Sequence, residues 1–172
     1  MSLKLLLVRA LYRLKSLRED PVDIFKRLGV ESNDQILEIG CAIGYHTLAL
    51  AELVREGKIY AVDIWEEGLR FLRSRIEPGQ AIEPICRSAE DIEFPSGSLD
   101  KIFCFDTLHE LPHPEEAVQR WAGFLKEDGR FYFKDPKIPP EQVERFSNGR
   151  LRKVDMTQGI AIFAFGSEQG FT

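Results

Sequence analysis

Short apolar segments alternate with amphipathic ones along most of the chain. The apolar runs have strand length and predict five β-strands, at residues 35–40, 58–63, 81–87, 99–106 and 129–134. Helical periodicity predicts helices in three of the intervals between strands, at residues 43–55, 66–75 and 114–126. Apolar strands separated by helices are typical of a parallel sheet that is buried on both faces. We therefore expect an α/β fold.

The C-terminal part of the chain breaks this alternation. A short helix is predicted near residues 140–146, followed by two strands at about 151–156 and 159–165. The two strands are too close in sequence for a helical crossover, so they must pair antiparallel. The prediction is a three-layer αβα sandwich whose mostly parallel sheet ends in an antiparallel hairpin. Ligands of such sheets bind beyond the carboxyl ends of the strands.

The first 30 residues have a different pattern. Apolar residues recur at helical spacing with basic residues on the other face, at Leu3, Leu7, Ala10, Leu11, Leu14 and Leu17. A second short helix begins at Pro21 and stops at Gly29. We expect residues 1–30 to form helices that dock on, or form a lid over, a domain of residues 31–172. A helix lying on a membrane surface is the alternative for the first segment, which is too short for a membrane span.

Composition narrows the class of protein. The 172 residues include 23 basic and 28 acidic ones, a net charge of −5, which has the wrong sign for binding through phosphate neutralisation. Nucleic acid is therefore not an expected partner, and neither is a membrane. Cys41, Cys86 and Cys104 stand singly in apolar runs, which predicts buried free thiols and no metal site. We expect a cytoplasmic protein.

The turn after the first strand has the sequence Glu38-Ile39-Gly40-Cys41-Ala42-Ile43-Gly44-Tyr45. Small residues at positions 40, 42 and 44 let a ligand approach the backbone closely. A dinucleotide fingerprint would need glycines at positions 42 and 45, where the chain has Ala42 and Tyr45. The turn is therefore poorly suited to binding a pyrophosphate. Glu38 is a better neighbour for an ammonium group. A zwitterionic amino acid would suit both the turn of small residues and the carboxylate of Glu38.

Asp63 ends the second strand, at a place where an acid can accept both hydroxyls of a ribose. A nucleoside that carries an amino acid therefore fits, and S-adenosylmethionine has this structure. From about residue 33 to 165 the sequence resembles the class I methyltransferase family. Its first motif is matched by Glu38, Gly40 and Gly44, with Ala42 in place of the middle glycine. Further matches follow in the family's order at Ala89–Pro95, Leu99–Asp100, Leu108–Pro112 and Leu125–Arg130.

This resemblance implies a Rossmann-like seven-stranded sheet of order 3-2-1-4-5-7-6 and a methyltransferase that uses S-adenosylmethionine. Besides the first motif and Asp63, it nominates further cofactor-binding residues, namely Cys41, Tyr45, Ile64, Trp65, Ser88, Ala89, Glu90 and Asp106. Ile64 and Trp65 would lie near the adenine. Ser88 stands where relatives commonly have an Asp, so its contact with the adenine amino group should be weaker.

Asp106 and His109 follow the fourth strand, in the region from which the family builds the wall near the transferred methyl group. Methyl transfer needs a base only if the acceptor loses a proton. We hypothesise that His109 is this base, with pocket lining or turn capping as the alternative. Asp135 either faces the substrate side or merely ends the fifth strand before Pro136. His46 could touch the ligand.

The acceptor leaves few traces in the sequence. No cap is inserted between the fifth and sixth strands, and no Asn-Pro-Pro-Tyr motif follows the fourth, which argues against nucleobase methylation. We expect a small-molecule acceptor. The missing cap leaves three alternatives open, namely an open site, a homodimer or partner protein that covers it, and a macromolecular acceptor. The alternative is a catalytically weak S-adenosylmethionine-binding module that acts as a partner subunit.

Overall fold

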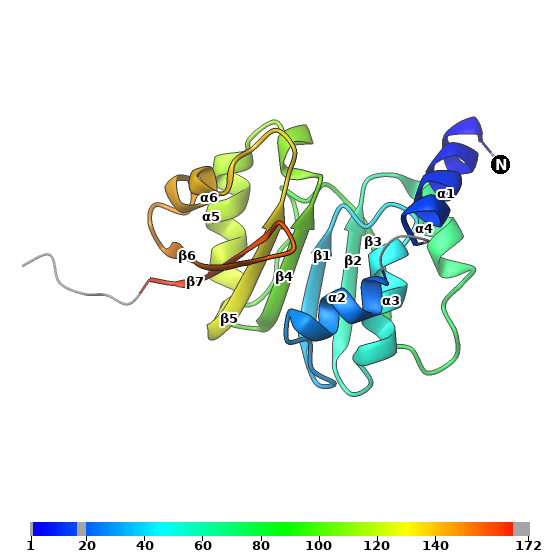
Figure 1. Cartoon of the computed structure of the whole chain (residues 1–172), viewed down its shortest axis with the longest axis horizontal. Coiled ribbons are helices and arrows are strands. Elements are labelled where there is room, and N and C mark those ends of the chain that lie inside the picture. Colours follow the sequence, from blue (N-terminus) through cyan, green and yellow to red (C-terminus); the bar gives the residue numbers. More distant parts are fainter. Residues whose placement is uncertain (1, 17–19, 167–172) are drawn as a thin grey trace, which may run out of the picture. The chain divides into compact units, whose positions relative to one another are not determined.

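Seven strands form one sheet in the order β3-β2-β1-β4-β5-β7-β6 (Figure 1). The computed structural model describes residues 2–16 and 20–166, so Leu17 of the predicted apolar stripe lies outside the described residues. The strand order is the one that the family resemblance implied, and the sheet is flanked by helices, which confirms the α/β class. The chain divides into two units, Met1–Ala89 and Glu90–Thr172.

Unit 1 holds three parallel strands of the sheet. Its elements are α1 (Leu3–Ser16), α2 (Pro21–Arg27), β1 (Gln35–Ile39), α3 (Tyr45–Leu53), β2 (Lys58–Asp63), α4 (Glu66–Arg73) and β3 (Ile82–Cys86). β1 pairs parallel with β2, and β2 with β3. Ile39 is opposite Val62 and Asp63 is opposite Cys86, so the three strands end at the same edge. The turns after β1 and β2 are therefore neighbours.

Helix α1 contacts α4 through its basic and aromatic face. Lys4 lies over the ring of Trp65 and Arg9 over that of Phe71, with distances to the ring centroids of 4.4 and 4.8 Å. Tyr12 stacks on Tyr45 at a centroid distance of 4.8 Å. Cation–π and stacking contacts thus hold this face of α1 against α3 and α4, while Leu3, Leu7, Leu11 and Leu14 of the predicted apolar stripe are exposed.

Unit 2 holds the remaining strands. Its elements are β4 (Leu99–Phe105), the 3₁₀ helix η1 (Leu108–Glu110), α5 (Pro114–Phe124), β5 (Leu125–Lys134), α6 (Pro140–Phe146), β6 (Leu151–Thr157) and β7 (Ile160–Phe165). β4 pairs parallel with β5, whereas β5–β7 and β6–β7 are antiparallel, which confirms the predicted hairpin. Trp121, Phe131 and Phe163 are fully buried in its core. Phe105 is opposite Lys134, so the segments after β4 and β5 meet at one edge.

Some local predictions were wrong. β5 begins at Leu125, earlier than predicted, because Leu125 pairs with Leu99 ahead of an irregularity in the β4–β5 register. Lys126 binds Asp100 there, with 2.6 Å between Nζ and Oδ1. Cys86 is exposed at the end of β3, although all three thiols were expected to be buried. Among the described residues, no helix is long and apolar enough to cross a membrane.

Candidate functional site

The turn between β1 and α3 is built on left-handed backbone conformations. Gly40, Ala42 and Gly44 have φ values of +76°, +49° and +80°. A Cβ atom on Gly44 would lie 2.3 Å from Leu72 Cδ1, so only glycine fits there. Ala42 adopts a conformation that disfavours side chains, at a position where the family has glycine. The backbone amides of Gly40 and Cys41 both donate to the Val62 carbonyl, at 2.9 and 3.1 Å, which ties the turn to the end of β2.

Asp63 joins the two neighbouring turns. Its Oδ2 accepts a hydrogen bond from the Ala42 amide at 2.7 Å, and its Oδ1 accepts one from the Trp65 amide at 2.8 Å. These two bonds fix the carboxylate at the edge of the sheet. Each carboxylate oxygen has a second lone pair, so both can still accept a hydroxyl proton. This geometry fits a residue that holds the two hydroxyls of a ribose.

Glu38 is a buried acid in β1, with only 4% of its surface exposed. Its Oε2 accepts a hydrogen bond from Thr47 Oγ1 on α3 at 2.5 Å, while His46 Nδ1 lies 3.9 Å from Oε1. Burial raises the pKa of Glu38 to about 7, against the lowering effect of the Thr47 hydrogen bond, and the charge of Asp63 adds to the rise. A cation would favour the ionised carboxylate. The site therefore fits the ammonium group of an amino-acid ligand.

Other predicted cofactor residues of unit 1 vary in their surroundings. Ile64 is 75% exposed beside the end of β2, and Trp65 immediately precedes α4. Cys41 and Ala89 are buried, and Ser88 is partly buried. The Tyr45 ring stacks on Tyr12 of α1. Their roles toward the cofactor stay predictions.

His46, which the sequence offered as a possible ligand contact, packs edge-on against the rings of Phe25 and Tyr45, with centroids 5.8 and 5.1 Å away. Thr47, the hydroxyl partner of Glu38, was not among the predicted residues. Thr47 is fully buried. The sequence signal that could have found it is its position, as a polar residue early in a helix that follows an acid-bearing strand.

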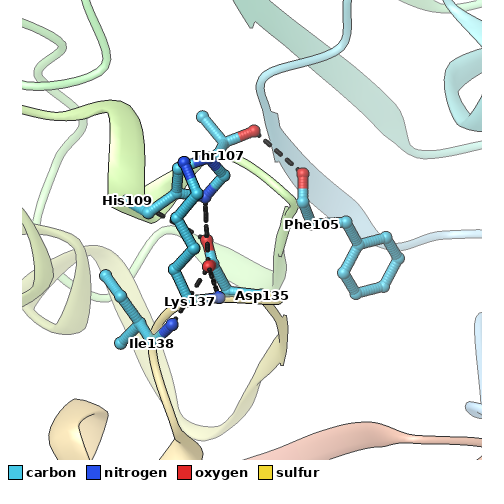
Figure 2. Close-up of polar contacts among 6 residues, drawn as sticks. All are labelled: Phe105, Thr107, His109, Asp135, Lys137 and Ile138. Carbon is cyan, nitrogen blue, oxygen red and sulfur yellow. Dashed lines mark hydrogen bonds and ion pairs between the residues drawn. The ribbon is translucent and has the colours of Figure 1, made fainter.

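His109 and Asp135 form a close pair in unit 2 (Figure 2). His109 lies in η1, after β4, and Asp135 follows β5. Nδ1 of His109 lies 3.0 and 2.9 Å from Oδ1 and Oδ2 of Asp135, and the His109 amide donates to Oδ2 at 3.2 Å. The amides of Lys137 and Ile138 donate to Oδ1 at 2.9 and 3.2 Å. The carboxylate thus orients the imidazole through several contacts at once.

The charge state of Asp135 follows from its surroundings. The Asp135 side chain has no exposed surface, and 14% of the His109 side chain is exposed. Burial alone would raise the pKa of Asp135, but hydrogen bonds from Lys137, His109 and Ile138 outweigh it and hold this pKa below its ordinary value. An ionised Asp135 selects the tautomer with the proton on Nδ1. Nε2 is then the ring nitrogen that accepts a proton.

Two further predicted residues of unit 2 lie near this pair or near α5. Asp106, just after β4, has a φ of +53° and donates its amide to the Lys134 carbonyl at 2.7 Å. Such strained conformations often occur at functional sites. The carboxylate of Glu90 accepts a hydrogen bond from the His113 amide at 2.6 Å, just before α5. The cofactor-binding role of both residues, and a catalytic role of Asp106, stay predictions.

Comparison with known proteins defines the family. A sequence family described as "Methyltransferase domain" matches residues 37–133, more than half of the chain. The chain therefore belongs to this family of methyltransferase domains. It is 30% identical over 140 residues to the uncharacterized methyltransferase YcgJ of Bacillus subtilis, an alignment that covers 78% of this chain and 54% of that protein.

A second curated relative is the ubiquinone biosynthesis O-methyltransferase of Idiomarina loihiensis, 30% identical over 101 residues that cover 58% of this chain and 41% of the relative. The chain spans about half the length of the curated relatives it matches.

Solved structures share the fold. A SAM dependent methyltransferase from Aquifex aeolicus superposes with a TM-score of 0.69 at 20% identity, covering 88% of this chain and 96% of that one. The YcgJ structure from Bacillus subtilis has a TM-score of 0.68 at 22% identity and covers 80% of this chain and 70% of that one. The predicted family and its fold are confirmed, and the comparisons do not favour the partner-module alternative.

Proposed function

We propose that this domain moves the methyl group of S-adenosylmethionine to an oxygen of a small, largely apolar molecule, with His109 as the general base. The observation that carries the proposal is the pairing of His109 Nδ1 with the buried carboxylate of Asp135 at 2.9 Å. A base is useful only when the acceptor loses a proton, as a hydroxyl does. A relative named for O-methylation in ubiquinone biosynthesis supports this acceptor class, and one named for fatty-acid O-methylation supports an oxygen acceptor on an apolar molecule.

The chain's own residues would hold the cofactor at the edge of unit 1. Asp63 would accept the ribose hydroxyls, and Glu38 would face the ammonium group. The turn from Gly40 to Gly44 would let the amino-acid part approach the backbone, because its small residues leave room beside their left-handed backbone. S-adenosylmethionine supplies a methyl group activated by the positive charge on its sulfur.

The proton balance assigns the roles in unit 2. As the new O–CH₃ bond forms and the S–CH₃ bond breaks, the acceptor hydroxyl would lose its proton to Nε2 of His109. The carboxylate of Asp135 would stabilise the imidazolium that results, and it keeps the ring in one orientation. General-base assistance of this kind contributes about 10²- to 10⁴-fold to a rate.

The test uses the full chain with S-adenosylmethionine and a panel of phenols, hydroquinones and fatty acids, and it measures S-adenosylhomocysteine formed in the presence of each acceptor. With the best phenol or hydroquinone acceptor, we expect His109→Ala to lower kcat about 10²- to 10³-fold. His113→Ala is the matched control, because His113 makes no side-chain cap hydrogen bond at the start of α5. An unchanged kcat in His109→Ala would show that this residue is not the base.

A further inference from the structure

Helix α1 carries a stripe of exposed leucines. Five of the eight large hydrophobic side chains that are exposed among the described residues belong to this helix. Their exposed fractions are 72% for Leu3, 45% for Leu6, 62% for Leu7, 63% for Leu11 and 62% for Leu14. Leu3, Leu7, Leu11 and Leu14 are three or four residues apart, so they share one helix face. Contiguous exposed apolar surface of this kind marks an interaction site.

The opposite face of α1 is already used. Leu5 is buried, and the Ser2 amide donates to Glu67 Oε1 at 2.8 Å. Lys4 and Arg9 lie over aromatic rings of the α4 region, which keeps α1 beside α4 (Figure 1). The leucine stripe therefore faces away from the surface on which the helix is docked.

The distribution of charge along the chain indicates what kind of partner binds to the leucine stripe. Residues 1–18 contain five basic residues, at positions 4, 9, 13, 15 and 18, and no acidic one. The remainder of the chain, from residue 19 on, contains 18 of the 23 basic residues and all 28 acidic ones. Its net charge is therefore −10. Lys4, Arg9 and Arg13 are exposed on the helix that carries the leucines. The helix with the leucine stripe thus also carries clustered positive charge in an otherwise acidic protein.

We propose that α1 attaches the protein to the surface of an anionic phospholipid bilayer. The leucines would enter the boundary between headgroups and acyl chains, and the basic side chains would reach the lipid phosphates on flexible stems. Anionic lipid attracts such clustered basic residues and repels the acidic remainder of the chain, so the helix would be the point of contact. A second copy of the chain is a weaker fit, because two helices of 14 residues bury little surface and their basic residues would repel.

The experiment is sedimentation of the full chain with vesicles, with bound protein measured against lipid concentration. The vesicles contain phosphatidylcholine with or without about one third phosphatidylglycerol, a fraction chosen so that headgroup charge dominates binding. We expect binding to the anionic vesicles alone, weakened at least about tenfold when salt is raised to about 0.5 M, where charges are screened within a few ångströms.

Two double variants separate the stripe from general apolar exposure. Leu7→Glu with Leu11→Glu should weaken vesicle binding at least about tenfold, because each glutamate opposes both the apolar and the charge contribution. Val154→Glu with Met156→Glu is the matched control on β6, where the two side chains are 56% and 51% exposed, and it should bind like the wild type. Circular dichroism checks that both variants fold.

Several outcomes would overturn the proposal. They are equal binding of both double variants, no preference for anionic vesicles, or no vesicle binding at all. Light scattering, which measures the oligomeric state, gives a further outcome that would overturn the proposal. A dimer that only the Leu7→Glu, Leu11→Glu variant loses, without vesicle binding by the wild type, would assign the stripe to a second copy of the chain. None of these results depends on methyl transfer, so failure here leaves the proposed function intact.

Discussion

The candidate cofactor site of unit 1 and the His109–Asp135 pair of unit 2 are built by different means. In unit 1, backbone amides and left-handed turn residues position Asp63. Ala42 and Trp65 donate their amides to it. In unit 2, the candidate base is positioned by a side chain 26 residues away, which backbone amides hold in turn. A site made by the backbone leaves a motif of glycines at fixed spacing, whereas a site made by side chains leaves only residue types at strand ends.

Removing the carboxylate of Asp63 should have the largest effect. In the proposed cofactor site, Asp63→Ala would remove the acceptor for both ribose hydroxyls, and two hydrogen bonds to a charged group correspond to at least about a 100-fold loss of affinity. Calorimetric titration with S-adenosylhomocysteine measures the change. His109→Ala is the contrasting variant and should bind S-adenosylhomocysteine like the wild type. Equal losses in the two variants would contradict the division of roles between the two regions.

Substitutions of glycine test how far the turn in unit 1 depends on its backbone. Gly44→Ala places a Cβ atom 2.3 Å from Leu72 and adds a side chain at a φ of +80°, so the free energy of unfolding should fall by about 3 kcal/mol. Gly29→Ala is the matched control, because Gly29 has a φ of +73° but no atom within 4 Å of the added Cβ. Its loss should be about 1 kcal/mol. Urea unfolding gives both values, and similar losses would mean that packing against Leu72 is unimportant.

The buried acid Glu38 gives the most pH-dependent effect. Its folded-state pKa of about 7 lies above the ordinary 4.5, so the folded protein binds the proton more tightly than the unfolded chain. Stability should therefore fall as pH rises from about 4.5 to about 7, by up to about 3 kcal/mol. Glu38→Gln should remove most of this dependence. Urea unfolding of both proteins at pH 5 and pH 8 measures it, and parallel pH profiles would rule out a raised pKa.

Much of the fold could be predicted because its central strands, such as β1 and β4, are largely buried and have apolar sequences. The start of β5 could not, since Lys126, Glu127 and Asp128 are polar and join the strand through an irregular register with β4. The sequence also could not predict which face of α1 packs against the domain. Periodicity finds two faces of a helix, but aromatic partners on other elements decide which face docks.

The two candidate sites also differ in how far the sequence predicts them. The spacing of Glu38, Gly40, Gly44 and Asp63 in the sequence is enough to indicate a ligand. His109 and Asp135 each stand at a strand end, but nothing in the sequence pairs them. Their contact depends on β4 pairing with β5 so that Phe105 is opposite Lys134, and this register is a tertiary property.

The most direct test of the account is a calorimetric titration of the wild-type chain with S-adenosylmethionine, S-adenosylhomocysteine and NAD in parallel. The arrangement of Glu38, Asp63 and the turn between them predicts that both sulfur-containing nucleosides bind at one site per chain and that NAD does not bind. Binding of NAD alone, or of none of the three, would contradict it.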